Sequence, residues 1–122
     1  MKYAMTFIRF SRKKEYEELE CRLKSYAEMA GYSVVWQECL RLITPKSPVD
    51  EIIINTLNDL HFQDIKVDAI IVVRYDHIHR EFTQTAKLIK TLSHYGVRII
   101  SIEETVDEND PLLTEIYYPI QL

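Results

Sequence analysis

Four short apolar runs, each bounded by polar residues, predict the strands of a sheet. The first, YAMTFIRF at 3–10, is rich in aromatic and β-branched residues, which favour a pleated, buried strand. The runs YSVVW at 32–36 and VRIISI at 97–102 have the same character. The run DAIIVV at 68–73 is apolar at consecutive positions, so both faces of that strand would be buried. This pattern is typical of a central strand in a parallel sheet.

Three segments between these runs carry apolar residues at spacings of three and four, the period of an amphipathic helix. The first stripe ends at Gly31, a residue that commonly stops a helix, and consists of Tyr16, Leu19, Leu23, Tyr26, Ala27 and Ala30. The second begins near Val49, has acidic residues suited to a helix start, and contains Ile52, Ile53, Leu57 and Leu60. The third ends near Gly96 and contains Phe82, Ala86, Ile89 and Leu92.

Strands and helices alternate along the chain, which predicts an α/β fold with three layers. We expect a mainly parallel four-stranded sheet of flavodoxin-type topology, flanked by helices and joined by right-handed crossovers. Residues 37–48 contain two prolines and no clean period, and they are predicted to form a loop. One domain is expected over 1–104. An acidic linker and C-terminal tail would follow over 105–122, with a mobile acidic stretch at 103–110.

Composition narrows the class of protein. The chain has 122 residues, enough for one core, and its net charge of −4 is unlike that of a free-standing nucleic-acid binder. No signal peptide or membrane-spanning run is present in the sequence, so we expect a cytoplasmic protein with no membrane contact. Cys21 and Cys39 are expected to be reduced and buried.

Polar clusters follow the first and third predicted strands. Arg9 and Ser11 lie at the end of the first, and the run from Asp76 to Arg80 follows the third. Function in open parallel sheets gathers at the carboxyl ends of the strands, so both clusters are expected in one crevice. A metal site at Asp76, His77 and His79 is the weaker interpretation, because side chains two positions apart diverge on a strand or helix.

The segments FIRFSRKKEYEELECRLKSYAEMAGYSVV and VDAIIVVRYDHIHREFTQTAKLIKTLSHYGVRIISIEE together resemble the catalytic domain of serine recombinases, the resolvase/invertase family. The first matches the family's strand ending in Tyr-x-Arg-Val-Ser and the helix after it. The second matches the Asp-Arg-Leu-x-Arg motif, which follows an apolar strand and precedes a helix. The resemblance covers roughly residues 2–104 and implies a resolvase-like fold.

The resemblance also implies a reaction on DNA. In that family a serine hydroxyl attacks a phosphodiester without a metal or other cofactor, and arginines stabilise the transition state. Ser11 aligns with the nucleophile, while Arg9 and Arg80 align with phosphate-binding arginines. Asp76 aligns with an aspartate that would orient an arginine or assist proton transfer. The expected partners are the DNA backbone and either a second copy or a full-length recombinase, as in mobile elements.

Departures from the family pattern concern charge. His77 occupies the place of the first arginine of the second motif, where it would act as a general acid rather than as a fixed cation. Glu15 and Glu20 stand where glutamines are frequent. An arginine expected before the second helix has only Arg41 or Lys46 as a substitute. If Leu122 is the natural terminus, the family's long dimerisation helix and DNA-binding domain are missing.

Two alternatives to a recombinase remain open on the sequence alone. One is a non-catalytic interaction or regulatory module that keeps the fold and has lost the reaction. The other is a flavodoxin-like domain that binds a small phosphorylated ligand, although no glycine-rich loop supports it. The recombinase interpretation predicts an enzyme and the two alternatives do not, so the sequence alone leaves enzymatic activity undecided.

Overall fold

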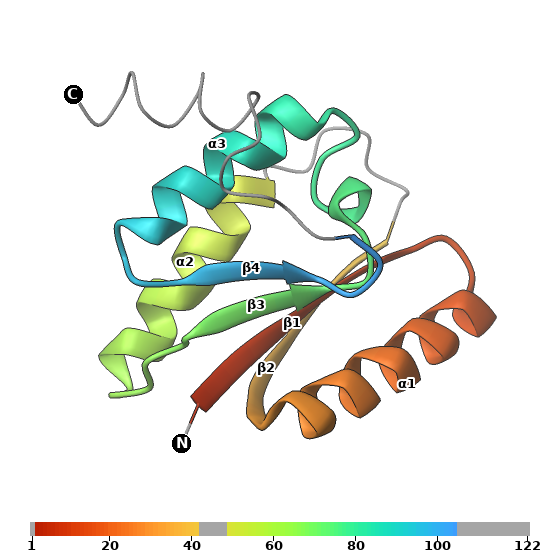
Figure 1. Ribbon diagram of the computed structural model, residues 1–122, viewed down its shortest axis with the longest axis horizontal. Coiled ribbons are helices and arrows are strands. Elements are labelled where there is room, and N and C mark those ends of the chain that lie inside the picture. The colour runs from red at the N-terminus through yellow and green to blue at the C-terminus, as the bar shows by residue number, and fades with distance from the viewer. Residues whose placement is uncertain (1, 42–48, 105–122) are drawn as a thin grey trace.

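The computed structural model describes residues 2–41 and 49–104. They form a four-stranded sheet of order β2-β1-β3-β4 in which all neighbouring strands are parallel (Figure 1). This confirms the predicted α/β fold class. The elements in chain order are β1 (Lys2–Phe10), α1 (Lys13–Ala30), β2 (Tyr32–Arg41), α2 (Val49–Phe62), β3 (Ala69–Val72), the 3-10 turn η1 (Tyr75–His77), α3 (Phe82–Ser93) and β4 (Arg98–Ser101).

The sheet separates two apolar layers, with α1 on one face and α2 and α3 on the other (Figure 1). On the α1 side the buried residues are Ala4, Ile8, Leu19, Leu23, Ala27, Ile71 and Val73. On the opposite side the larger cluster includes Met5, Phe7, Val49, Ile53, Ile70, Val72, Leu88 and Leu92. Alternate residues of β1 and β3 therefore point into different layers, as the two-residue period of a strand requires. Burial on both faces explains the continuous apolar runs in the sequence.

The predicted helical stripes are confirmed where the helices meet the sheet. On α1 the buried residues are Leu19, Leu23 and Ala27, three members of its stripe. Gly31 ends this helix in the left-handed conformation, with φ of 81°, and its amide donates to carbonyls of the last turn. A side chain would strain that backbone conformation, so glycine is the natural residue there.

The prediction of a loop over 37–48 was wrong in its first part, because β2 continues to Arg41. Residues 37–41 pair with residues 6–10 of β1 in parallel register. The register shifts at Val35, where β2 has one extra residue. This bulge moves the following side chains to the opposite faces and breaks the alternation that would reveal a strand. Residues 42–48, including Lys46, lie outside the described residues.

The expected burial of the cysteines was also wrong. Cys21 and Cys39 are both exposed, since they lie on the outer side of α1 and on the edge strand β2. The predicted linker and tail at 105–122 lie outside the described residues. Within residues 2–41 and 49–104, none of the helices has the length and apolar composition needed to cross a bilayer.

Candidate functional site

The sheet order brings the two polar clusters to one edge. β1 and β3 are hydrogen-bonded parallel neighbours, so their carboxyl ends lie side by side. Arg9 and Ser11 follow the buried part of β1, and the segment from Arg74 to Arg80 follows β3. Glu103 and Glu104 lie just after β4, the next strand of the sheet. The candidate site is therefore built from the ends of three neighbouring strands.

Arg9 lies at this edge, near the end of β1. Its Nε atom is buried and makes no hydrogen bond in the described part of the chain. Burial lowers the pKa of the Arg9 guanidinium, because removal from water penalises its charge. The ordinary pKa of arginine is so high that the group nevertheless stays protonated. A partly buried guanidinium with an unused donor is suited to bind an anion.

Ser11 lies in the short connection between β1 and α1, and its side chain is exposed. Its Oγ donates a hydrogen bond to Oε2 of Glu15, at 3.3 Å, in the first turn of α1. The residue at the helix N-cap is Arg12, which makes no side-chain capping hydrogen bond. Ser11 is therefore not the N-cap of α1, and its hydroxyl is directed to a carboxylate that can accept a proton.

The residues after β3 form a compact cluster around Arg74. One nitrogen of the Arg74 guanidinium lies 3.3 Å from Nε2 of His77. The Nε atom of the same guanidinium lies 3.4 Å from Asp76 and 3.7 Å from Glu103. Asp76 therefore contacts an arginine, Arg74, and the role expected of Asp76 from the sequence stays a prediction.

His77 is a neutral residue in this cluster. Its side chain is buried, and burial together with the Arg74 charge lowers its pKa, although the carboxylates of Asp76, Glu15 and Glu103 oppose that shift. A guanidinium can only donate, so Nε2 of His77 accepts from Arg74 and the ring proton belongs on Nδ1. Nδ1 is buried and has no partner among the described residues. His77 therefore supplies no fixed positive charge.

The electrostatics also connect the two motifs. The Glu15 carboxylate, which accepts from Ser11, is one of the charges that act on the pKa of His77. The start of α1 therefore lies close enough to the turn η1 for the Glu15 charge to act on His77. The prediction that the two motifs share one region of the structure agrees with this placement. The catalytic roles assigned to their residues remain a prediction.

His79 is directed away from this cluster. Its Nε2 lies 2.6 Å from Oδ1 of Asp50, in the first turn of α2, whereas His77 contacts Arg74. The two histidines thus diverge, as side chains two positions apart do in regular structure. In residues 2–41 and 49–104, no group of three His, Cys, Asp or Glu side chains is placed to hold a metal ion.

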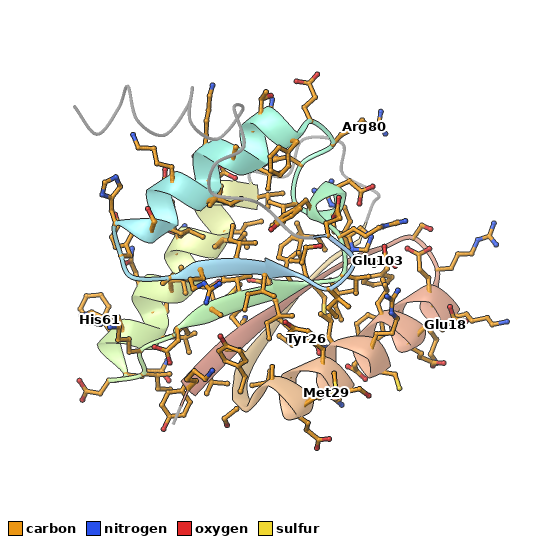
Figure 2. The ribbon with its side chains drawn as sticks, viewed as in Figure 1. Glu18, Tyr26, Met29, His61, Arg80 and Glu103 are labelled. Carbon is orange, nitrogen blue, oxygen red and sulfur yellow. The ribbon has the colours of Figure 1, made fainter. Side chains whose placement is uncertain are left out.

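Arg80 does not join the cluster either. It is exposed, and it makes no hydrogen bond or ion pair with the residues the structure describes. In Figure 2 its side chain extends from the loop before α3, while Glu103 lies near the end of β4. Of the five residues predicted for the site, Arg9, Ser11, Asp76 and His77 lie at the strand ends, and Arg80 lies farther out.

The second glutamate in a glutamine position, Glu20, belongs to a separate network. It accepts hydrogen bonds from Tyr16 at 2.8 Å and from Gln37 at 2.7 Å, which join α1 to β2. These two bonds lower the pKa of Glu20, against the opposing effect of burial. The bond to Glu20, followed by burial, raises the pKa of Tyr16 to about 12. Glu20 is therefore occupied by structural contacts, and Glu15 is the glutamate beside Ser11.

Sequence reasoning missed Arg74 and Glu103 as site residues. Arg74 is the first residue after the buried run of β3, where a charged side chain emerges at the functional edge. A charged residue directly after a buried strand could therefore have been predicted as a site residue from the sequence. Glu103 could not be identified in the same way, because its contacts with Arg74 and with Arg22 of α1 join residues distant in sequence.

Comparison with known proteins gives a family match and a set of similar folds. The family model described as "Resolvase, N terminal domain" matches residues 4–121. No curated protein matches the chain significantly. Among solved structures, the N-terminal catalytic domain of TP901-1 integrase is similar over 98% of this chain and 92% of that one, with a TM-score of 0.71 and 20% identity.

Two further solved structures have the same fold. A resolvase family site-specific recombinase from Streptococcus pneumoniae is similar over 99% of this chain and 86% of that one, with a TM-score of 0.72 and 18% identity. The C-terminal catalytic domain of ISC1926 TnpA, an IS607-like serine recombinase, is similar over 97% and 79%, with a TM-score of 0.62 and 22% identity. At these identities the likeness shows the fold alone.

Proposed function

Because the chain belongs to the resolvase N-terminal domain family, we propose that it acts on DNA as the catalytic domain of a serine recombinase, with Ser11 as the nucleophile. The observation that carries this proposal is the hydrogen bond from Ser11 Oγ to Glu15. It lies at the edge of the sheet where β1 ends, next to Arg9. A hydroxyl next to a proton acceptor and an arginine has the components of metal-free phosphoryl transfer.

The reaction can be written on these residues. Ser11 Oγ attacks the phosphorus of a DNA phosphodiester, and its proton passes to the Glu15 carboxylate. A serine–phosphorus bond forms, the bond from phosphorus to the 3′ oxygen breaks, and the 3′ hydroxyl leaves with a proton from solvent. Arg9 neutralises charge on the phosphoryl oxygens, and Asp76 contacts Arg74 until the phosphate displaces it. Arg80 is exposed before α3, and in this proposal it contacts the DNA backbone outside the cluster.

The acidic surroundings of the site favour a second candidate, a non-catalytic module. The carboxylates of Asp76, Glu15 and Glu103 all act on His77, and they would repel a DNA phosphate as well. In that case the fold would serve partner binding, to a second copy or to a full-length recombinase. We propose a cytoplasmic location for the protein under either candidate.

Trapping of a covalent intermediate distinguishes the two candidates without knowledge of the DNA target. The chain is incubated with a pool of DNA duplexes of randomised sequence and analysed on a denaturing gel. The catalytic function predicts a slower protein band and a nucleotide phosphate on the Ser11 peptide by mass spectrometry. Ser11→Ala should abolish the band. The matched control is Ser25→Ala, which removes another exposed serine on α1 and should leave it unchanged.

The absence of a covalent species with the unaltered chain, under conditions where the pool binds, would contradict the catalytic function. A band that persists in Ser11→Ala would show that another group is the nucleophile. Partner capture that survives Ser11→Ala and is lost when residues 112–122 are removed would favour the non-catalytic module. A rise in melting temperature with free nucleotides and none with DNA would instead favour a small-ligand site.

A further inference from the structure

The segment after β3 has lost the positive charge expected at position 77 but has an arginine three residues earlier. His77 accepts a hydrogen bond from Arg74 at Nε2 and is buried and neutral. Arg74 by contrast has a side chain that is 52% exposed, at the mouth of the site. The charge at this end of β3 therefore belongs to Arg74.

We propose that Arg74 binds the phosphate in this site and that it provides the fixed positive charge that His77 does not provide. This assignment rests on the proposed function and adds a residue to it. His77 would be a positioning residue, because its ring accepts from one guanidinium nitrogen and fixes the direction of the others. An arginine held in this way presents its remaining donors to an anion in a defined geometry.

The distances around Arg74 show that its donors are not used up. Its Nε lies 3.4 Å from Asp76 and 3.7 Å from Glu103, both longer than a charge-assisted hydrogen bond of about 2.8 Å. Glu103 is held more closely by Arg22, at 2.9 Å. The carboxylate contacts are thus loose and solvent-exposed, and pairs of this kind contribute little free energy. A phosphate can displace them at small cost.

Arg74 and Arg9 also lie on adjacent strands. Each emerges at the carboxyl end of its strand, and β1 and β3 are hydrogen-bonded neighbours. Arg9 has a buried nitrogen without a partner among the described residues. The two guanidiniums would therefore approach a bound phosphate from neighbouring strands. Two arginines are enough to offset the single charge of a phosphodiester.

The test is a titration of the full 122-residue chain with inorganic sulfate, in which binding is monitored by the backbone amide shifts in NMR spectra. We expect saturable shifts of the amides near Ser11 and Arg74. Arg74→Gln should weaken sulfate binding about tenfold, since it removes a charge-assisted contact. The matched control is Arg22→Gln, which removes the same charge and also loses an ion pair with Glu103, and should weaken binding less than about threefold.

A double variant tests whether a positive charge at position 77 can replace the one at position 74. Adding His77→Arg to Arg74→Gln should restore sulfate affinity to within about threefold of the unaltered chain. Equal weakening by Arg74→Gln and Arg22→Gln would overturn the proposal, because only the overall field would then matter. Failure of the double variant to recover affinity would overturn the exchange of charge between the two positions.

The failure of this proposal can be distinguished from failure of the proposed function. If Arg9→Gln abolishes sulfate binding while Arg74→Gln leaves it unchanged, the phosphate site stands and the role of Arg74 is refuted. If the unaltered chain gives no saturable shift with sulfate or with a short DNA duplex, both proposals fail. Amides remote from the site, such as those of α2, report in each variant that the fold is intact.

Discussion

Replacement of Glu15 by glutamine separates two effects that this carboxylate has on the site. Glu15 accepts the proton of Ser11 in the proposed reaction, and its charge also faces the position of the incoming phosphate. Glu15→Gln keeps an oxygen that can accept a hydrogen bond but removes the charge and the basicity. Glutamine is also the residue that is frequent at this position in the family pattern.

The expected size of each effect follows from the geometry. The distance from Ser11 Oγ to Glu15 Oε2 is 3.3 Å, so a phosphate that contacts Ser11 would lie about 6 Å from the carboxylate. At that separation in water-like surroundings the repulsion is about 0.7 kcal/mol, which weakens binding about threefold. Loss of a general base, by contrast, slows a reaction about 100-fold or more. Sulfate carries two negative charges, so its repulsion by Glu15 is about 1.4 kcal/mol and its affinity should rise about tenfold in Glu15→Gln, while formation of the covalent species falls about 100-fold.

The assay combines the sulfate titration with the rate of covalent trapping on the randomised duplex pool. The matched control is Glu18→Gln, which removes the same charge from an exposed position one turn farther along α1 (Figure 2). It should leave the trapping rate unchanged. A faster rate in Glu15→Gln, together with tighter sulfate binding, would refute the role of Glu15 as proton acceptor and leave it only as a repelling charge.

Three further predictions test the packing and the titrating groups. Leu23→Ala, at a residue with no exposed surface, should lower the free energy of unfolding by about 3 kcal/mol in urea. Met29→Ala on the same helix, where the side chain is 82% exposed, should cost under about 0.5 kcal/mol, and equal losses would contradict the assignment of the α1 core face. The folded chain lowers the pKa of His77 from its ordinary 6.5, so the unfolded chain takes up the proton more readily and stability should fall as pH drops below about 6.5. Urea unfolding at pH 7 and pH 5 should show a smaller difference in His77→Gln, and an unchanged difference would mean that other groups cause the loss. Burial raises the pKa of Tyr75, and the bond to Glu20 raises the pKa of Tyr16 to about 12. Absorbance titration should therefore show an ionisation at about 12 that loses one tyrosine in Tyr16→Phe, and an unchanged amplitude there would refute the assignment to Tyr16.

The sequence was most informative about elements whose burial is one-sided or complete. The stripe of α1 and the run that became β3 could be read directly, because a helix face and a doubly covered strand impose periods of their own. The second half of the edge strand β2 was missed. The sequence predicted a strand at 32–36, but the bulge at Val35 and the polar residues after it hide both periods, and only the pairing with β1 shows that the strand continues to Arg41.

The candidate site divides in the same way. Sequence motifs predicted Arg9, Ser11, Asp76, His77 and Arg80 as site residues, because the motifs consist of residue types at fixed spacing within each segment. They could not show that His77 is neutral or that Arg74 provides the charge beside it. Both properties depend on burial and on contacts between side chains, and these exist only once the strands are assembled.

By itself, therefore, the sequence determined the order of the elements, the parallel α/β fold and the edge of the sheet where the site lies. These follow from hydrophobic periodicity and chain connectivity, which are local properties. The tertiary structure decided which groups carry charge, since Glu15 faces Ser11, Glu20 is bound by Tyr16 and Gln37, and Arg74 lies against His77. Protonation and ion pairing depend on distances between residues far apart in the chain, and only the folded protein sets those distances.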